Sequence, residues 1–212
     1  MKPFVIVCDF DGTVTVEDVT NIIWDAHLDY DWRATLVPPS REGRWTALEM
    51  IAQGYGGVRV AEDQLLAEVR PQAHLRPGFT DFVALCRDRR WHFEVVSHGL
   101  GFYIRDILPP GIALTSFEGT YEGGRWRVRL PDGMTLAPGE DFKTQVVANL
   151  LARHPGHDTI YVGDGRLDFP AARGCDRVFA VRGSVLAAHC RAAGVPFVEF
   201  DTFAEVSAGL LS

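Results

Sequence analysis

The chain has 212 residues, of which 47% are hydrophobic and 23% are charged. These fractions are typical of a folded globular protein and argue against disorder or a disulfide scaffold. The formal net charge of -7 argues against a sequence-independent nucleic-acid binder, which needs a basic surface. No apolar run is long enough for a signal sequence or a membrane span, and the four cysteines show no metal-ligand spacing. We therefore expect a cytoplasmic protein with reduced thiols and with no nucleic-acid or membrane partner, and the oligomeric state is left open.

Short apolar runs rich in β-branched and aromatic residues predict buried strands. These runs cover residues 4–8, 92–96, 159–162, 178–181 and 196–200. Helical patterns that begin with a capping or proline signal lie between the later runs, at residues 78–89, 142–153 and 185–193. Strands that alternate with helices predict an α/β fold, here a Rossmann-like parallel sheet with helices on both faces.

A long segment separates the first two predicted strands. It has about eighty residues, far more than the ~12 residues that an ordinary crossover needs. Its helical patterns, at residues 17–28, 45–53 and 61–70, predict a small helical cap inserted after the first strand. We therefore expect a cap domain at residues 14–76 and a core domain formed by residues 1–13 and 77–212. Two strand-like arms around a glycine pair predict a β-hairpin within residues 117–128 of the core.

Polar residues follow three of the predicted strands, at the edge where parallel sheets bind their ligands. The three segments are Asp9-Phe10-Asp11-Gly12-Thr13, Ser97-His98-Gly99 and Gly163-Asp164-Gly165-Arg166-Leu167-Asp168. The first and third segments together bring four carboxylates, which repel one another unless a hard divalent cation with oxygen ligands is present. The sequence therefore predicts a magnesium site, with Asp9 and Asp164 as direct ligands and the Asp11 carbonyl as a third.

A carboxylate beside such a cation can attack phosphorus, which splits a difficult hydrolysis into two easier displacements. We expect Asp9 to form an aspartyl-phosphate, and Asp11 to protonate the leaving alkoxide and later to deprotonate the attacking water. Lys143, at a predicted helix start, would neutralise developing charge. The phosphoryl oxygens would be held by Ser97 and by the backbone amides around Gly12 and Gly99.

Each of these signals has a simpler explanation when it is taken alone. An Asp-x-Asp-Gly segment after a strand is also typical of a turn or a calcium-binding loop. A serine after a strand is commonly a helix cap, and a lone lysine is commonly a surface charge. Because the signals occur together and in order, each at a predicted strand or helix end, they favour a site that handles phosphate.

The chain resembles the haloacid-dehalogenase superfamily of phosphatases in all four of its motifs, and the likeness spans nearly the whole chain. Within that superfamily, the helical insert after the first motif is similar to the cap of the phosphoserine-phosphatase-like branch. That branch includes the subgroup that hydrolyses an enolic methylthiopentenyl phosphate in methionine salvage. The resemblance implies Asp9 as nucleophile and Asp11 as acid/base. It also implies magnesium held by Asp9, Asp11 and Asp164, with Asp168 in support.

The chain departs from the family pattern in two of its motifs. Where this branch commonly has Ser-Gly-Gly, the sequence has Ser97-His98-Gly99, which puts an imidazole beside the expected phosphate site. His98 is interpreted either as a substrate contact or proton carrier, or as an ordinary packed or exposed histidine. Leu167 replaces a residue that is often polar, which would alter the contacts around the phosphate.

The expected cap contains several candidates for substrate contacts. Asp18 falls where the branch often has an acidic residue that faces the substrate. Six further residues are candidates for the pocket, although the aromatic ones are also typical of a cap core and the arginines of a surface. They are Trp24, His27, Trp32, Arg41, Arg44 and Trp45.

The cap also bears on the substrate, a small-molecule phosphate ester. When the cap is aligned without gaps from Glu42-Gly43, the carboxylate-binding arginine of phosphoserine-cleaving relatives falls on Gly54, which offers no cation. We therefore expect phosphoserine not to be the best substrate, and 2-hydroxy-3-keto-5-methylthiopentenyl-1-phosphate is the first named candidate. The alternatives are phosphoserine or another small phosphomonoester and, less favoured, a non-catalytic regulatory protein of the same fold that binds a phosphate ligand.

Overall fold

Seven strands form one sheet in the computed structural model, which describes residues 3–137 and 139–212. Their order across the sheet is β4-β3-β2-β1-β5-β6-β7, with β1 at the centre. All neighbours pair in parallel except β3 and β4, which form an antiparallel hairpin. The strands are β1 (Phe4–Cys8), β2 (His92–Leu100), β3 (Ala113–Glu122), β4 (Arg125–Arg129), β5 (Asp158–Gly163), β6 (Arg177–Val181) and β7 (Val198–Phe200).

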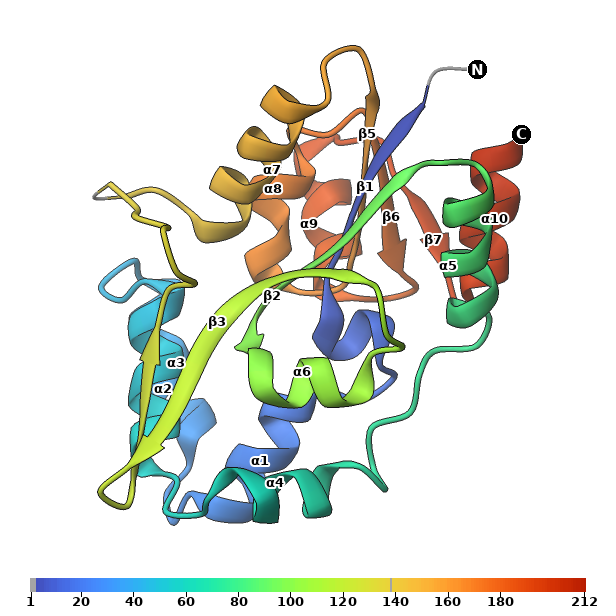
Figure 1. Cartoon of the computed structure of the whole chain (residues 1–212). Coiled ribbons are helices and arrows are strands. Elements are labelled where there is room, and N and C mark those ends of the chain that lie inside the picture. Colours follow the sequence, from blue (N-terminus) through green and yellow to red (C-terminus); the bar gives the residue numbers. More distant parts are fainter. Residues whose placement is uncertain (1–2, 138) are drawn as a thin grey trace.

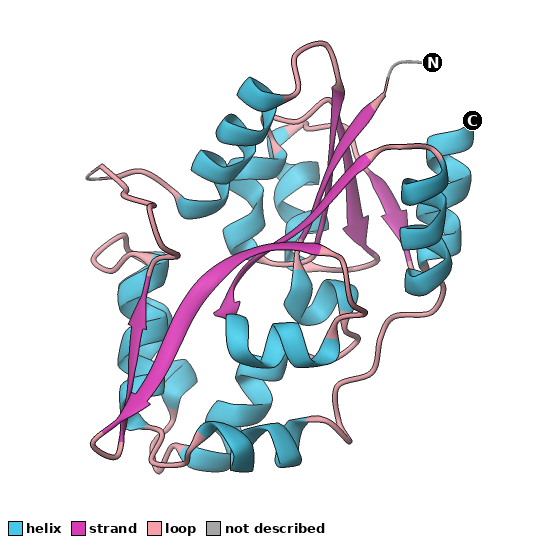
Figure 2. Cartoon of the chain, in the orientation of Figure 1, coloured by secondary structure: helices cyan, strands magenta, loops and turns pink. Residues whose placement is uncertain are grey.

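Helices cover both faces of this sheet (Figures 1 and 2). One face carries α5 (Phe79–Asp88) and α10 (Phe203–Leu211), which pack together through aromatic side chains. The other face carries α7 (Phe142–Arg153), α8 (Phe169–Ala172) and α9 (Val185–Ala193). The prediction of a Rossmann-like α/β fold is therefore confirmed.

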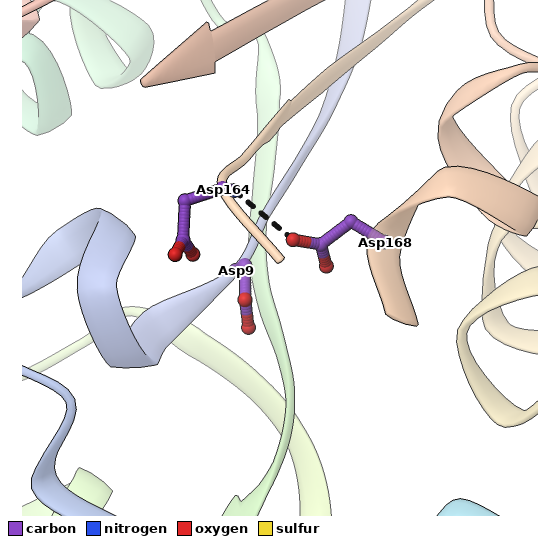
Figure 3. Close-up of side chains that lie close together, drawn as sticks. All are labelled: Asp9, Asp164 and Asp168. Atoms are coloured by element: carbon purple, nitrogen blue, oxygen red, sulfur yellow. Dashed lines mark hydrogen bonds between the residues drawn. The ribbon is translucent and has the colours of Figure 1, made fainter. Parts of the chain in front are cut away.

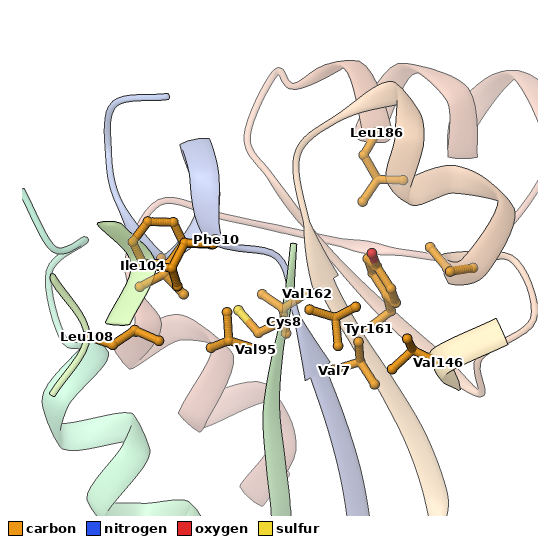
Figure 4. Close-up of a cluster of buried hydrophobic side chains, with 14 of the residues drawn as sticks. Val7, Cys8, Phe10, Val95, Ile104, Leu108, Val146, Tyr161, Val162 and Leu186 are labelled. Carbon is orange, nitrogen blue, oxygen red and sulfur yellow. The ribbon is translucent and has the colours of Figure 1, made fainter. Parts of the chain in front are cut away.

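The core lies on both sides of the central strand (Figure 4). Every residue of β1 is buried, so its sequence is a continuous apolar run rather than an alternation of apolar and polar residues. Val7 faces the side of Val146 on α7, while Cys8 faces the opposite side together with Val95. The backbone register puts Cys8 opposite Val95 of β2 and Val162 of β5, so the residues that follow β1 and β5 emerge at the same edge.

Four helices form the segment between β1 and α5, which we call the helical insert (residues 14–76). They are α1 (Val19–His27), α2 (Trp32–Arg41), α3 (Ala47–Gly57) and α4 (Glu62–Val69). Capping side chains begin three of them, because the carboxylates of Asp18 and Asp31 and the hydroxyl of Thr46 accept hydrogen bonds from backbone amides of the first turn. The insert lies beyond the carboxyl end of β1, as Figure 1 shows.

The hairpin of β3 and β4 extends from the sheet to the insert and packs beside α3 (Figure 1). The indole of Trp126 donates a hydrogen bond of 2.9 Å to the carbonyl of Val60, and the hydroxyl of Tyr121 donates one of 2.7 Å to the carbonyl of Arg59. The hairpin therefore ties the insert to the edge of the sheet.

Several elements differ from those expected from the sequence. Helices α2, α6 (Gly101–Ile107), α8 and α10 were not predicted, and α2 contains two prolines near its end that obscure its pattern. Strand β2 continues to Leu100, so the Ser97-His98-Gly99 segment lies within its irregular end rather than after it. Strand β7 begins at Val198, two residues later than expected. Among the described residues, no helix is long and apolar enough to cross a membrane.

Candidate active site

Asp9 lies directly after β1, where the sheet ends. Its backbone amide donates to the carbonyl of Val162, which continues the pairing of β1 with β5 by one residue. The residue is only 8% exposed. The Oδ1 atom accepts a hydrogen bond of 2.7 Å from the Phe10 amide and lies 2.6 Å from Nζ of Lys143. These contacts hold the carboxylate in one orientation, which a nucleophile requires.

Lys143, near the start of α7, is the buried cation of the site. Its side chain is almost inaccessible, and its Nζ lies 2.6 Å from one oxygen of Asp9 and 2.6 Å from one oxygen of Asp168. Burial disfavours the ammonium form, but the charges of Asp168 and Asp9 outweigh burial and raise the pKa of Lys143. The lysine is therefore charged at neutral pH and partly offsets the two carboxylates.

Asp168 organises the loop that follows β5. Its Oδ1 accepts from Lys143 and from the hydroxyl of Tyr161, and its Oδ2 accepts from the backbone amides of Asp164 and Gly165. Burial opposes ionisation, yet Lys143 and these donors keep the pKa of Asp168 below its usual value. Because both oxygens are already occupied, Asp168 is suited to support a metal site rather than to bind the ion directly.

The carboxylates of Asp9, Asp164 and Asp168 converge from two loops (Figure 3), and one oxygen of each lies within 4.8 Å of the others. The hydroxyl of Thr13 donates to Asp164 at 2.9 Å. On the other side of Asp164, Gly12 adopts a positive φ of 75°, and a Cβ there would lie 2.7 Å from a carboxylate oxygen.

This donor set fits a hard cation such as magnesium, because its atoms are carboxylate oxygens and its charges are unbalanced. Burial and the charge of Asp168 raise the pKa of Asp9 well above its usual value. Burial and the same neighbour raise the pKa of Asp164 to about 7. Burial is the larger cause of both shifts, and the charge of Asp168 adds to it, while Lys143 offsets only part of the effect. Asp9 and Asp164 are thus suited to be direct ligands.

Asp11 lies apart from this cluster and is held by different partners. Its Oδ1 accepts a hydrogen bond of 3.0 Å from the backbone amide of Val19, and its Oδ2 accepts one of 2.6 Å from the hydroxyl of Tyr103. Burial and the nearby charge of Asp18 raise the pKa of Asp11 to about 8. A carboxyl group with such a pKa is protonated at neutral pH and can act as a general acid.

Arg76 fixes the backbone of the loop that carries Asp11, and the sequence offered no signal for this role. Its buried guanidinium donates to the carbonyl of Thr13 at 2.8 Å and to the carbonyl of Gly12 at 2.6 Å. Arg76 is the last residue of the helical insert, more than sixty residues after the loop it holds. It therefore ties the end of the insert to the loop that precedes its start.

The Ser97-His98-Gly99 segment forms one wall of the site. Ser97 is buried, and its Oγ accepts a hydrogen bond of 3.0 Å from the amide of Gly99. His98 is buried, and its ring packs between Phe117 and Phe142. Burial, reinforced by the charge of Lys143, lowers the pKa of His98 well below its usual value, so this imidazole is neutral. Its Nε2 has no hydrogen-bond partner among the described residues.

These groups line a cavity of about 350 Å³ between the sheet edge and the helical insert. Asp9, Asp11, Lys143 and Asp164 lie on its core side. The insert contributes a half-buried carboxylate, three further polar or charged residues and five apolar residues that form one wall. These residues are Asp18, Thr20, Asn21, Trp24, Trp32, Val37, Arg41, Met50 and Ile51.

The structure separates the six candidate pocket residues of the insert into two groups. Trp24, Trp32 and Arg41 line the cavity. The other three are not among its lining residues. His27 pairs with Glu68, Arg44 pairs with Glu42, and Trp45 is partly buried against the core.

Other lining residues were not anticipated from the sequence. Val37, Met50 and Ile51 follow the periodicity of their helices, as any core residue does, so no local signal marks them as pocket residues. Arg166 also lines the cavity, where its guanidinium donates to Ser40 of α2 at 2.9 Å.

Comparison with known proteins places this arrangement in a family. The model of the haloacid dehalogenase-like hydrolases matches residues 6–173. The chain is 26% identical to the polyol phosphate phosphatase of Saccharomyces cerevisiae, over 99% of the chain and 93% of that protein. It is also 26% identical to the 2-hydroxy-3-keto-5-methylthiopentenyl-1-phosphate phosphatase of Exiguobacterium sp., over 96% of the chain and 95% of that protein.

Solved structures agree with this fold. A substrate-bound complex of phosphoserine phosphatase superposes with a TM-score of 0.74 at 15% identity, covering 98% of both chains. A phosphoserine phosphatase carrying an analogue of the phospho-aspartyl intermediate gives a TM-score of 0.73, also at 15% identity, and covers 98% of this chain and 99% of that one. The family match extends over most of the chain and includes the strands that carry the acidic cluster, and the chain therefore belongs to the haloacid dehalogenase-like hydrolases.

Proposed function

We propose that this protein hydrolyses a small-molecule phosphate monoester, with magnesium as its cofactor and an aspartyl-phosphate on Asp9 as its intermediate. The observation that carries the proposal is the combination of residues at the core side of the cavity. An oriented carboxylate, Asp9, contacts a buried lysine and lies beside a second carboxylate, Asp164. A separate carboxyl group with a raised pKa, Asp11, lines the same cavity.

The reaction needs two displacements at phosphorus. In the first, a carboxylate oxygen of Asp9 forms a bond to phosphorus, the bond from phosphorus to the leaving oxygen breaks, and Asp11 donates its proton to that oxygen. In the second, a water molecule attacks the same phosphorus, Asp11 takes up a proton from the water, and Asp9 is released with inorganic phosphate. Magnesium, when bound by Asp9, Asp164 and the Asp11 carbonyl, would supply positive charge to the phosphoryl oxygens.

Three further groups are placed to bind the phosphoryl group. Ser97 and Gly99 line the cavity together with Asp9, and we expect the Ser97 hydroxyl and the Gly99 backbone to contact the phosphoryl oxygens. The Gly99 amide donates to the Ser97 hydroxyl and the Gly12 amide donates to the Glu17 carbonyl, so either amide would have to exchange its partner to bind phosphate. The ammonium of Lys143 would offset the charge that develops on phosphoryl oxygens. His98, whose ring is neutral, would offer its unpaired Nε2 to the substrate rather than a positive charge.

We also propose that residues 14–76 act as a cap domain over a core formed by residues 1–13 and 77–212. The insert supplies the apolar wall of the cavity, opposite the acidic cluster. Such a wall would enclose the leaving group and exclude bulk water, which strengthens the electrostatic interactions at phosphorus.

For the substrate, 2-hydroxy-3-keto-5-methylthiopentenyl-1-phosphate is our first candidate. The indole of Trp24 packs against Gly54, where a Cβ would lie only 2.2 Å from the ring. An arginine that binds the carboxylate of phosphoserine therefore has no room at this position. The nearby apolar side chains of Trp32, Met50 and Ile51 suit a thioether tail.

Two other readings of the same site remain as alternatives. One is a phosphatase for phosphoserine or for another small ester, such as a polyol phosphate, the substrate named for the yeast relative. The other is a non-catalytic protein that binds a phosphate ligand. The second alternative is disfavoured because Asp9, Asp11, Lys143 and Asp164 are all present and all line one cavity.

The first experiment measures release of p-nitrophenol from p-nitrophenyl phosphate with magnesium present. Asp9→Asn should abolish turnover and covalent labelling by phosphate, because the amide keeps the volume but removes the nucleophilic oxygen. Circular dichroism of the variant checks that the fold is intact, and mass spectrometry excludes deamidation of the asparagine back to aspartate. Near-normal turnover by the intact asparagine variant would rule out the covalent mechanism.

A second experiment compares kcat/KM for the enol phosphate, phosphoserine, phosphocholine and simple sugar and polyol phosphates. This ratio reports how strongly each transition state is bound. We expect the enol phosphate to lead and phosphoserine to rank lower. If phosphoserine leads by about tenfold, which is roughly 1.4 kcal/mol, our interpretation of Gly54 and Trp24 is wrong.

A further inference from the structure

Three hydroxyl and carboxyl groups from separate elements form a chain that ends at the general acid. The hydroxyl of Tyr103, on α6, donates a hydrogen bond of 2.6 Å to Oδ2 of Asp11. The same hydroxyl lies 3.0 Å from the hydroxyl of Thr20, on α1 of the helical insert. Because a tyrosine hydroxyl has one hydrogen, which goes to Asp11, Thr20 is the donor in the second hydrogen bond.

The contact between Tyr103 and Asp11 needs the space beside Gly99, which has no side chain. A Cβ on Gly99 would lie 1.9 Å from the hydroxyl oxygen of Tyr103 and 2.6 Å from Oδ2 of Asp11. Gly99 does not have a positive φ, so backbone conformation does not demand glycine there. The absence of a side chain at this position is instead what allows Tyr103 and Asp11 to meet.

The tyrosine is itself held rigidly. It is fully buried, and its ring packs against Phe10 and edge-on against Phe102, with centroids 6.0 Å and 5.4 Å away. Asp11 has one other anchor, the amide of Val19, on its opposite oxygen. With both oxygens anchored from different directions, the carboxyl group cannot rotate without losing a hydrogen bond.

We propose that Tyr103 is a positioning residue that orients Asp11 for proton transfer, and that Thr20 extends this restraint to the helical insert. Tyr103 takes no part in bond making. It holds the carboxyl group of Asp11 facing the leaving oxygen. Thr20, on the first helix of the insert, restrains Tyr103 in turn through its hydrogen bond. This inference rests on the proposed function, because it assigns Asp11 the transfer of a proton in phosphate-ester hydrolysis.

The test uses two aryl esters of nearly equal shape, phenyl phosphate and p-nitrophenyl phosphate. Phenoxide is the more basic leaving group and depends more on a general acid. For both esters, kcat/KM reports the steps up to release of the phenol. Tyr103→Phe should lower kcat/KM for phenyl phosphate by about tenfold or more, and that for p-nitrophenyl phosphate by less than about threefold.

Thr20→Val keeps the side-chain shape and leaves Tyr103 in place, so it tests the same chain if Tyr103→Phe does not fold. Thr20→Val should lower the ratio of kcat/KM for phenyl phosphate to kcat/KM for p-nitrophenyl phosphate, by a smaller factor than Tyr103→Phe does. Tyr121→Phe is the matched control, since that hydroxyl also donates one hydrogen bond but to the Arg59 carbonyl, outside the cavity. The control should leave the ratio unchanged.

The outcomes separate this inference from the proposed function. If the unchanged protein shows no turnover that depends on Asp9, the proposed function fails. If the unchanged protein is active but Tyr103→Phe leaves both esters unaffected, or slows both equally, the proposed function stands and the positioning role is wrong. Equal slowing would mean that Tyr103 only supports the fold of the site.

Discussion

Lys143→Met is expected to lower both the stability and the activity of the protein. Methionine replaces the aliphatic part of the side chain but removes the ammonium that lies 2.6 Å from Asp9 and 2.6 Å from Asp168. All three side chains are almost fully buried. In the variant, two carboxylates remain close together without their cation.

Removal of one partner from a buried ion pair costs about 3–5 kcal/mol, because the remaining charge is left uncompensated. Asp168 keeps its hydrogen bonds from Tyr161 and from two backbone amides, so we expect the lower end of that range. For a chain of this size, about 3 kcal/mol corresponds to a fall in Tm of roughly 6–12 °C. The loss of charge stabilisation at phosphorus should also lower kcat by about 100-fold or more.

The destabilisation should depend on pH in a defined direction. Lys143 lowers the pKa of Asp168 against the effect of burial, so in the unchanged protein this contribution to stability is present above the unfolded-state pKa and is lost only in strong acid. In the variant the pKa of Asp168 rises, and its protonation relieves the repulsion. The difference in Tm between the two proteins should therefore shrink as the pH falls from about 7 to about 5.

The assay is thermal unfolding followed by circular dichroism, with a chelator present so that no metal compensates for the missing charge. Phosphate release is measured in parallel with magnesium. A variant with the Tm of the unchanged protein near neutral pH would contradict the electrostatic account of Lys143. A difference in Tm that grows as the pH falls would contradict it equally.

Three further predictions follow from the site and the insert. A chelator should abolish phosphate release and magnesium should restore it, whereas calcium, with more ligands at longer distances, should not; full activity in excess chelator would exclude the metal site. Because Asp11 has a pKa of about 8 and acts in its protonated form, kcat/KM should fall as the pH rises above about 8, and Asp18→Asn should move this fall to lower pH by removing a like charge. If kcat/KM of this variant falls at the same pH as in the unchanged protein, Asp18 does not influence the pKa of Asp11. Gly54→Ala should displace Trp24, destabilise the protein by about 1–3 kcal/mol and change KM. Gly56→Ala, in the same helix but with open space around it, should not destabilise the protein. Equal effects of the two substitutions on the free energy of unfolding would refute the close contact between Gly54 and Trp24.

The acidic motifs of the candidate site could be recognised in the sequence because they follow predicted strands. The carboxyl ends of adjacent parallel strands lie at one edge of a sheet, so Asp9 and Asp164 had to come close once β1 and β5 were neighbours. Lys143 carries an additional signal in the composition of the chain. Only two of the 21 lysine and arginine residues are lysines, and one of them lies buried beside Asp9.

Contacts between distant segments had no such signal. Arg76 is more than sixty residues from the carbonyl groups it binds, and its neighbours in the sequence do not distinguish it from a surface arginine. Tyr103 lies on a seven-residue helix that was not predicted, and its role depends on the position of α6 beside the loop of Asp11. Gly99 was expected to present a backbone amide, but its missing side chain also makes room for Tyr103.

The sequence by itself determined the α/β fold, the helical insert and the acidic loops, because hydrophobic periodicity and strand ends are local properties of the chain. Only the tertiary structure decided the shape of the cavity. The ring of Trp24 fills the space over Gly54, and Arg166 of the core donates a hydrogen bond to Ser40 of the insert. Both contacts depend on packing between segments whose relative positions no local pattern specifies. The polar residues of the candidate site could therefore be identified from the sequence, whereas the apolar wall of the cavity depends on how the insert packs against the sheet.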